Sequence, residues 1–214
     1  MKTDDNNIEK AYDSWAHQYD SNRNKTRDLD AKATSETLSH YSFNDVLELG
    51  CGTGKNTLFL LKKASSIIGI DFSQEMLSKA KEKINDYRVQ FVKADLNDSW
   101  KIEHKSKDLI TSSLTLEHIK DFNHIFEQAH KVLRDNGLFF ISELHPFKQY
   151  SGSKARFESE NGLLELDVFT HHISDYLEHS KANGFVLLEM NEWFDEDDRS
   201  EIPRLISFVF KKSS

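Results

Sequence analysis

The sequence has few of the features that mark a secreted or membrane-spanning protein. Its only cysteine, Cys51, cannot form an internal disulfide, which fits a reducing compartment. The strongest apolar runs are each shorter than ten residues, whereas a membrane-spanning helix needs about twenty. The N-terminal stretch MKTDDNNIEKAYDSW carries acids and amides where a signal peptide has a basic start and an apolar core. We therefore expect a cytoplasmic protein without a membrane span.

Basic residues are scarce relative to acidic ones. Lysine and arginine together number 28, against 36 aspartates and glutamates, which gives a formal net charge of −8. The chain therefore lacks the basic footprint that binds a phosphate backbone, and we expect no nucleic-acid partner. Proline is almost absent, because only Pro146 and Pro203 occur. Proline therefore cannot interrupt a helix or a strand before residue 146.

Short apolar runs alternate with amphipathic segments through the middle of the chain. Strands and the helices between them are predicted in the order 44–50, 55–64, 65–71, 73–84, 87–95, 107–114, 121–134 and 137–144. Ser73 is expected to cap the second helix, and Asn136-Gly137 to close the third. This order predicts an α/β fold with a parallel sheet and helices on both faces.

The flanking segments complete one domain over residues 1–214, a length that buries a single core comfortably. Residues 1–42 are predicted to form one or two amphipathic helices, an N-terminal helical cap that precedes the first strand. A polar stretch over 146–167, expected to be irregular, is followed by a predicted helix near 170–184. Two β-rich runs, 185–194 and 205–212, are expected to pair antiparallel.

The stretch VLELGCGTGKNT, residues 46–57, is typical of a ligand-binding loop between a strand and a helix. Glu48 leads into three glycines with one residue between each, Gly50, Gly52 and Gly54. Glycines let a ligand touch the backbone, and the N–H groups of a helix N-terminus attract anionic or polar ligand groups. The loop therefore predicts a cofactor site at the carboxyl edge of the sheet.

Three residues bear on the kind of cofactor. A dinucleotide fingerprint has its third glycine where this chain has Lys55, which disfavours NAD and FAD. Asp71 ends the second predicted strand and suits a pair of ribose hydroxyls, a feature that nicotinamide cofactors share. Asp95 ends the third strand and suits the exocyclic amine of an adenine, although an Asx turn would also explain an aspartate there.

These residues together make the chain resemble the class I S-adenosylmethionine-dependent methyltransferases. The matching stretches, within about residues 40–145, are VLELGCGTG, IIGIDFSQEMLSKAKEK, VKADLND, DLITSSLTLEHI and VLRDNGLFFISE. The chain is most similar to the small-molecule branch with the ubiquinone/menaquinone-biosynthesis (methyltransferase type 11) group, partly through AYDSWAHQYD. The resemblance implies a Rossmann-like, doubly wound, seven-stranded, mostly parallel sheet with an antiparallel last strand, helices on both faces and the N-terminal helical cap.

The resemblance also implies how the chain holds S-adenosyl-L-methionine and the product S-adenosyl-L-homocysteine. Residues 43–145 would form the cofactor-binding core, and 146–214 the acceptor-side segment with the C-terminal strands. The glycine loop would cradle the methionine portion, Asp71 the ribose, and Asp95 with the Leu96 backbone the adenine; Ser112 and Ser113 would lie beside the sulfonium. The implied cofactor contacts are Tyr12, Tyr19, Glu48, Gly50, Cys51, Gly52, Gly54, Asp71, Phe72, Met76, Asp95, Leu96 and Ser112.

The N-terminal aromatic residues allow two interpretations. Tyr12, Trp15 and Tyr19 share one helical face, which could simply dock on the core. By resemblance, the same segment covers the cofactor and the acceptor, with Tyr12 or Tyr19 reaching the bound cofactor.

Candidate catalytic residues follow the fourth and fifth strands. Methyl transfer from a sulfonium depends chiefly on alignment, and a base is needed where the acceptor loses a proton. His118 is one candidate, with a structural or adenine-side role as the alternative. Glu143 and His145 are two residues apart, so an extended chain sends both to one side, and we hypothesise that Glu143 orients His145 as the base. A purely structural His145 is the competing interpretation.

Other features are less informative. Adjacent residues on a helix point apart, so His171 and His172 are not expected to share a metal ion, and no metal site is predicted. The acidic run at 195–198 is expected to be a solvated loop; at a pocket rim it would favour a cationic or amine acceptor. No asparagine/aspartate-proline-proline-aromatic signature follows the fourth strand, where TSSLTLEH stands, so RNA and protein substrates are disfavoured.

The leading hypothesis is a methyltransferase acting on an oxygen, nitrogen or carbon atom of a small organic acceptor, as a monomer or homodimer. A non-catalytic S-adenosylmethionine-binding module is the first alternative, because binding and catalysis use different residues. A nicotinamide-dependent oxidoreductase is the second and is disfavoured by Lys55 and Asp95.

Overall fold

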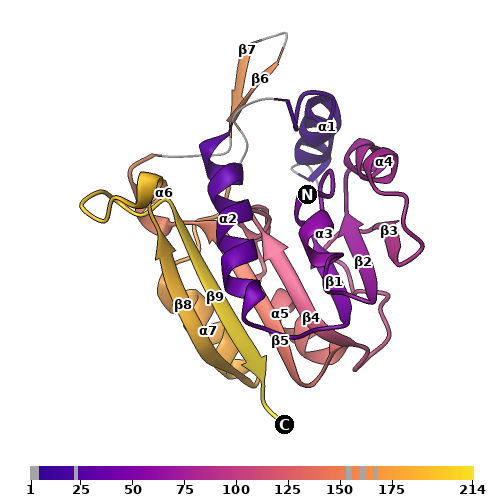
Figure 1. The fold of residues 1–214 in the computed structure, drawn as a ribbon. Coiled ribbons are helices and arrows are strands. Elements are labelled where there is room, and N and C mark those ends of the chain that lie inside the picture. Colours follow the sequence, from indigo (N-terminus) through magenta and orange to yellow (C-terminus); the bar gives the residue numbers. More distant parts are fainter. Residues whose placement is uncertain (1–4, 22–23, 153–155, 160–161, 166–167) are drawn as a thin grey trace.

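A seven-stranded sheet forms the centre of the molecule in the computed structural model (Figure 1). The structure describes residues 5–21, 24–152, 156–159, 162–165 and 168–214. The sheet strands are β1 (Asp45–Leu49), β2 (Ser66–Asp71), β3 (Val89–Lys93), β4 (Lys107–Ser113), β5 (Leu133–Leu144), β8 (Phe185–Trp193) and β9 (Leu205–Lys212). They lie in the order β3-β2-β1-β4-β5-β9-β8.

The direction of the strands confirms the predicted fold class. Strands β1 to β5 pair in parallel, whereas β9 is antiparallel to both β5 and β8. Strand order reverses between β1 and β4, so the loops after these two strands lie side by side at the carboxyl edge of the sheet. Ligands of doubly wound sheets bind at this position.

Helices cover both faces of the sheet because side chains of a buried strand alternate between them. Phe139 and Ile141 of β5 pack with α5 (Phe122–Val132) and α7 (Ile173–Ala182), whereas Phe140 packs on the opposite face with α2 (Lys25–Ser39) and α3 (Lys55–Leu60). Figure 1 shows α2 in front of the sheet and α5 and α7 behind it. Within the described ranges, no helix is long and apolar enough to cross a membrane.

Helix α2 and α1 (Asp5–Trp15) form the N-terminal cap, which agrees with the predicted helices. Helix α1 lies against α4 (Gln74–Lys83) near the carboxyl edge of the sheet (Figure 1). The hydroxyl of Ser73, which caps α4 as predicted, donates a 2.5 Å hydrogen bond to Asp13 of α1. A 2.7 Å ion pair between Lys93 and Glu9 adds a second polar contact. These contacts hold α1 beside the ends of β2 and β3.

Two predictions of local structure are wrong. Helix α5 ends at Val132 rather than at Asn136-Gly137, and β5 begins at once. The Lys212 ammonium donates to the carbonyl oxygens of His130 and Leu133, at 2.6 and 2.8 Å, and so satisfies the end of the helix. The stretch 146–167, expected to be irregular, contains α6 (Pro146–Tyr150) and a hairpin of β6 (Arg156–Ser159) and β7 (Gly162–Glu165).

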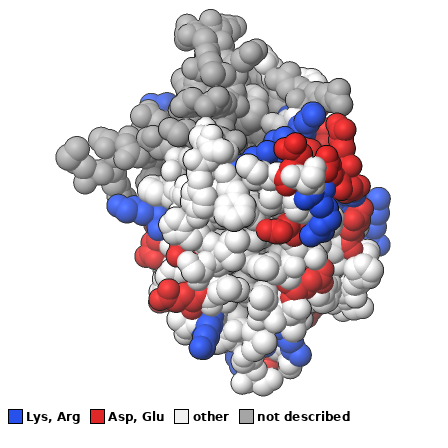
Figure 2. All heavy atoms as spheres, turned by 90° about the vertical axis from the view of Figure 1, so that its left-hand side faces the viewer, with Lys and Arg blue, Asp and Glu red and all other residues white. Residues whose placement is uncertain are grey.

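Strand β8 is the outer edge of the sheet on one side. Its exposed side chains include Val186, Leu188 and Met190. Figure 2 faces this side of the molecule and shows a central area without charged side chains. The charged residues of the site described below lie elsewhere, at the carboxyl ends of β1 to β5.

Candidate active site at the carboxyl edge of the sheet

The glycine loop after β1 is built from left-handed backbone. Gly50, Gly52 and Gly54 have φ values of 62°, 51° and 81°, a region that L-residues with side chains rarely adopt. A Cβ atom on Gly50 would lie 2.2 Å from the Oγ1 atom of Thr115, so the loop after β4 packs directly on this glycine. A Cβ atom on Gly52 would meet no described atom within 4 Å. Gly52 therefore faces open space.

That space consists of two adjoining cavities of about 770 and 500 Å³. Both are lined by Tyr19, Gly50, Gly52, Ser113 and Leu114. The larger cavity is completed by Ile8, Tyr12, Asp71, Phe72, Met76, Ala94, Asp95, Leu96, Asn97, Thr115, His118 and Ile119. The smaller cavity is completed by Arg27, Asp30, Glu48, Leu49, Cys51, Thr53, Lys55, Asn56 and Thr111.

Most of the residues predicted to contact a cofactor line one of these cavities. Tyr12, Tyr19, Gly50, Gly52, Asp71, Phe72, Met76, Asp95 and Leu96 line the larger one. Glu48 and Cys51 line the smaller one. Gly54 and Ser112 line neither: an added Cβ on Gly54 would meet Ile84 at 2.8 Å, and Ser112 is fully buried. Ser113, the next residue of β4, faces both cavities in place of Ser112.

Asp71 and Asp95 both line the larger cavity and are held by local backbone bonds. The Asp71 carboxylate accepts hydrogen bonds from the N–H groups of Gly52 at 2.8 Å and Ser73 at 2.9 Å. Burial raises the pKa of Asp71 to about 6 despite these bonds. Asp95 accepts from the N–H group and side-chain amide of Asn97, at 2.8 and 2.9 Å. The Asx turn offered as an alternative is thus present, on a residue that also faces the cavity.

Glu48 lies at the floor of the smaller cavity. Its carboxylate accepts a 2.5 Å hydrogen bond from the hydroxyl of Thr57 on α3. Burial raises the pKa of Glu48 to about 8, and the negative charges of Asp30 and Asp71 add to this effect. The floor of the smaller cavity is therefore acidic but only weakly ionised near neutral pH.

Aromatic residues of the N-terminal cap lie over the larger cavity. The Tyr12 hydroxyl is hydrogen-bonded to the Nε2 atom of His118 at 2.8 Å, and the Tyr12 ring packs edge-on against Phe72. The guanidinium of Arg27 lies 4.1 Å from the centre of the Tyr19 ring and donates to the Tyr19 carbonyl. Tyr12 and Tyr19 both line the cavity, whereas Trp15 packs on them from outside.

The hypothesised pair of Glu143 and His145 does not form, although both residues are buried. One Glu143 oxygen accepts from the N–H groups of Thr115 and Leu116, each at 2.9 Å. The Nδ1 atom of His145 accepts from the N–H group of Phe147 at 3.1 Å, and Nε2 lies 3.2 Å from Glu192. The prediction was wrong because His145 caps α6, where the chain leaves its extended path.

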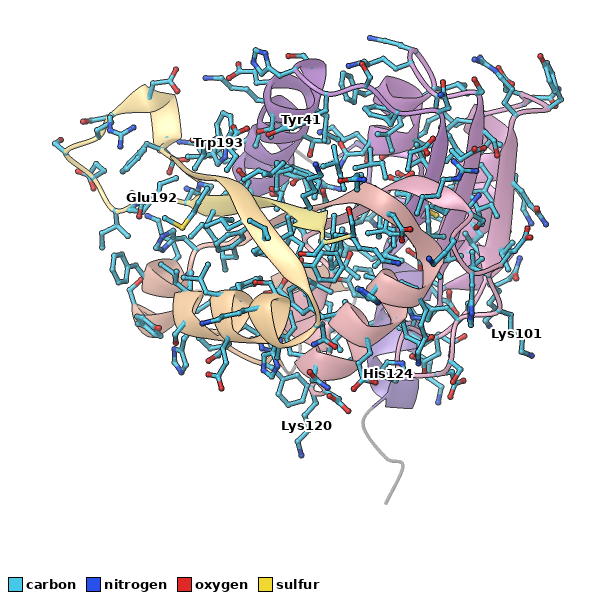
Figure 3. The ribbon with its side chains drawn as sticks, turned by 90° about the horizontal axis from the view of Figure 1, so that it is seen from below. Tyr41, Lys101, Lys120, His124, Glu192 and Trp193 are labelled. Carbon is cyan, nitrogen blue, oxygen red and sulfur yellow. The ribbon has the colours of Figure 1, made fainter. Side chains whose placement is uncertain are left out.

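Neither residue lines the two cavities, and their partners explain their positions. Glu143 fixes the loop after β4, which carries Thr115 and His118. Glu192 belongs to β8, the outermost strand, and lies with Trp193 toward the left of Figure 3. Burial lowers the pKa of His145, while the nearby Glu192 charge opposes that shift. Of the three predicted catalytic residues, His118 alone lines one of the two cavities described above.

A second buried carboxyl group accompanies Glu143. Burial raises the pKa of Glu143 to about 8, and the charge of Glu117 contributes to that rise. Burial likewise raises the pKa of Glu117 to about 7. Within the part of the chain that the structure describes, one oxygen of each carboxyl group has no hydrogen-bond partner. Glu117 immediately precedes His118 in the loop after β4, and Glu143 accepts hydrogen bonds from that loop.

Arg27, Asp30, Asn56 and Thr111 line the smaller cavity and were not identified from the sequence. Arg27 and Asp30 occur in the sequence KTRDLDAKATSETLS of α2, which has many polar residues. Most of these polar residues are of the types that occupy the solvent-exposed face of a surface helix. The only signal was that two charged residues stand three positions apart in a segment expected to cover the site.

Two remaining sequence features lie outside both cavities. The Nε2 atom of His171 lies 3.0 and 2.9 Å from the carbonyl oxygens of Leu116 and Ile119, and its ring stacks on Phe122. The neighbouring His172 is exposed and begins α7, so the two histidines point apart as predicted. In the acidic run, Asp197 pairs with Lys32 at 2.9 Å and lines a separate surface groove.

Comparisons with known proteins agree with this geometry. Residues 47–141 match a family model described as a methyltransferase domain. A carboxy-S-adenosyl-L-methionine synthase of Vibrio atlanticus is 28% identical over 159 residues, which cover 70% of this chain and 58% of that protein. The chain thus spans less than two thirds of the length of this curated relative.

Solved structures match the fold more completely. An S-adenosylmethionine-dependent methyltransferase of Clostridium acetobutylicum superimposes with a TM-score of 0.72 at 19% identity, covering 95% of this chain and 100% of that one. The DhpI protein, in a complex described as DhpI-SAM-HEP, gives a TM-score of 0.75 at 22% identity, with 94% of each chain covered. These likenesses show that the folds are the same.

Proposed function

Because the chain belongs to the class I S-adenosylmethionine-dependent methyltransferase family, with its methyltransferase domain at residues 47–141, we propose that it transfers a methyl group from S-adenosyl-L-methionine to a small organic acceptor. The observation that carries this proposal is the pair of adjoining cavities at the carboxyl edge of β1 to β4. The larger cavity contains Asp71 and Asp95, the smaller one contains Arg27, and Gly50 and Gly52 line both. S-adenosyl-L-methionine likewise has two parts, a nucleoside and an amino-acid tail, and each part would occupy one of the two cavities.

Under this proposal the adenosine occupies the larger cavity. Asp71 accepts hydrogen bonds from the ribose hydroxyls, and Asp95 with the Leu96 N–H group binds the adenine. The methionine tail enters the smaller cavity, where Gly50 and Gly52 allow close contact with the backbone. Arg27 is the buried cation suited to the carboxylate of that tail.

The sulfonium then lies where the two cavities meet, beside Tyr19, Ser113 and Leu114. Its methyl group is transferred by in-line displacement, and alignment supplies much of the rate acceleration. Tyr12 and Tyr19 of the cap cover the cavity and exclude water from the reaction. Where the acceptor must lose a proton, His118 is the proposed base, because it is the histidine that lines the cavity. Tyr12 holds its ring in place through the 2.8 Å bond.

Calorimetry with the full chain tests the cofactor assignment. S-adenosyl-L-homocysteine should bind, and NADH at the same concentration should not. The opposite result would support a nicotinamide-dependent oxidoreductase instead. S-adenosyl-L-homocysteine binding without transfer to any acceptor would support a non-catalytic binding module. The cytoplasmic location, the absence of a nucleic-acid partner and the monomeric or homodimeric state stay predictions.

A further inference from the structure

A surface groove of about 770 Å³ lies between α2 and β8 and shares no lining residue with the two cavities of the candidate active site. Four acids line this α2–β8 groove: Glu36 of α2, Glu189 and Glu192 of β8, and Asp197 of the loop after β8. Glu192 and Asp197 have the ion-pair partners described above. Glu36 and Glu189 are therefore the acids whose charge matters for a ligand.

The Glu189 carboxylate is held in place by neutral groups. It accepts a 2.8 Å hydrogen bond from the hydroxyl of Tyr41 and a 2.6 Å bond from the side-chain amide of Asn191. Within the described ranges, no lysine or arginine forms an ion pair with Glu189. These bonds fix the position of the carboxylate and leave its negative charge uncompensated.

The other charged residues of the groove do not neutralise it. The Arg199 guanidinium lies 4.8 Å from the centre of the Phe194 ring. In the part of the chain that the structure describes, neither Arg199 nor the exposed Glu36 forms an ion pair. The α2–β8 groove thus carries a net negative charge that a cationic ligand would complement.

A buried hydroxyl group also lines the groove. Thr37 follows Glu36 on α2 and is only 3% exposed. Its Oγ1 atom has no hydrogen-bond partner among the described residues. Leaving a buried hydroxyl unpaired is unfavourable, so a hydrogen-bond donor seated in the groove would stabilise this wall. This observation is independent of the acidic charge and also points to a ligand.

An aromatic ring contributes an apolar surface. The Nε1–H group of Trp193 donates to the hydroxyl of Ser207 at 2.8 Å. Since that donor is already used, the carbon surface of the ring remains for a ligand in the groove. Figure 3 shows Trp193 and Tyr41 on the side of the sheet that α2 covers. An indole ring attracts cations to its face and packs well against alkyl chains.

We infer that the α2–β8 groove binds an organic cation, namely a primary ammonium group at the end of an alkyl chain. An ammonium group only donates hydrogen bonds, and its donors match the Glu36 and Glu189 carboxylates and the Thr37 hydroxyl. These acceptors come from both sides of the groove, whereas the planar fork of a guanidinium suits one carboxylate. The alkyl chain packs against Trp193. The site does not depend on the proposed methyl transfer.

Free alkylamines and the lysine side chains of other proteins both carry this group. n-Pentylamine represents the first source, and an N-acetylated glycine–lysine–glycine amide represents the second. Their uncharged counterparts are 1-pentanol and the same peptide with an acetylated lysine side chain. Binding to the full chain is followed by tryptophan fluorescence at constant ionic strength, and the signal should disappear in Trp193→Phe. The amine should bind and 1-pentanol should not. Binding of the peptide as well would identify a lysine-bearing partner, and binding of the amine alone a free amine.

Three substitutions test the side chains that receive the ammonium group. Glu36→Gln and Glu189→Gln should each weaken n-pentylamine binding by about tenfold or more, because a charge-assisted bond is lost. Thr37→Val keeps the shape of the side chain and removes its hydroxyl. It should also weaken binding, but without lowering the free energy of unfolding, because the hydroxyl has no partner to lose.

Glu178→Gln is the matched control, because Glu178 is an exposed acid on α7 that lines neither the groove nor the cavities. It should bind n-pentylamine like the wild type. An equal loss in Glu178→Gln and Glu36→Gln would overturn the inference, since net charge alone would then explain binding. Equal binding of n-pentylamine and 1-pentanol, no binding of amine or peptide, or tighter binding of n-pentylguanidine would also overturn it. S-adenosyl-L-homocysteine affinity should be the same in all these variants.

Discussion

Replacing Gly52 with alanine separates ligand contact from folding stability. Gly52 lines both cavities, and no described atom lies within 4 Å of the position of an added Cβ. The new methyl group therefore enters the space proposed for the cofactor and displaces no protein atom. The contrast is Gly50, where the same change would place Cβ 2.2 Å from Thr115 and disrupt the packing of the loop after β4.

The expected magnitudes follow from the backbone and the cavity. Gly52 has φ of 51°, and a left-handed conformation costs a residue with a side chain about 1–2 kcal/mol. The free energy of unfolding should fall by about that amount. A methyl group forced against a closely packed ligand costs about 1–3 kcal/mol, so S-adenosyl-L-homocysteine should bind Gly52→Ala about 5- to 150-fold more weakly than the wild type.

Urea unfolding and calorimetry measure the two effects, and Gly152→Ala is the control. Gly152 has φ of 92°, and an added Cβ there also meets no described atom within 4 Å. It shares the backbone strain but lines neither cavity. Gly152→Ala should lose stability and keep its affinity for S-adenosyl-L-homocysteine. Equal affinities of the two variants would refute the contact between the glycine loop and the cofactor.

Three further substitutions test individual side chains. Asp71→Ala should weaken S-adenosyl-L-homocysteine binding by about 1.5–3 kcal/mol in calorimetry, because bonds to the ribose are lost; unchanged affinity would contradict this role. The pKa of Glu143 rises on folding from 4.5 to about 8, so the folded state binds the proton more tightly than the unfolded state. The free energy of unfolding of the wild type should therefore fall relative to that of Glu143→Gln as the pH rises from about 4.5 to 8. A difference between the two proteins that stays constant with pH in urea unfolding would exclude the shift. His118→Ala should lower turnover by about 10²-fold where the acceptor must lose a proton, because His118 is the proposed base. His145→Ala should only reduce the free energy of unfolding; an about 10²-fold turnover loss in His145→Ala at normal stability would restore His145 as the base.

The sequence predicted those parts of the site that depend on the order of strands. Glu48, Asp71 and Asp95 lie in or directly after three strands that run parallel in the sheet, and parallel strands bring their carboxyl ends to one edge. The position of each could therefore be inferred from local pattern alone. Lys55 likewise stands at the start of α3, where the dinucleotide fingerprint would have required glycine.

The rest of the site depends on contacts between distant segments. His145 pairs with Glu192, 47 positions later, because β8 and β9 fold back beside β5. Asp30 reaches Asn56 across the interface of α2 with α3. Neither contact leaves a period or spacing in the sequence, since each requires the packing of complete elements. The end of α5 was missed for the same reason, because the side chain that satisfies it comes from Lys212.

Strand β9 has a consequence for the order in which the chain can fold during synthesis. It lies between β5 and β8, and all but one of its residues are buried, although it is the last strand of the sheet to leave the ribosome. Until residues 205–212 emerge, β8 has no neighbour in the sheet, and the apolar edge of β5 stays open to other nascent chains. A premature stop shortly before residue 205 would thus remove an internal strand of the sheet rather than a dispensable tail.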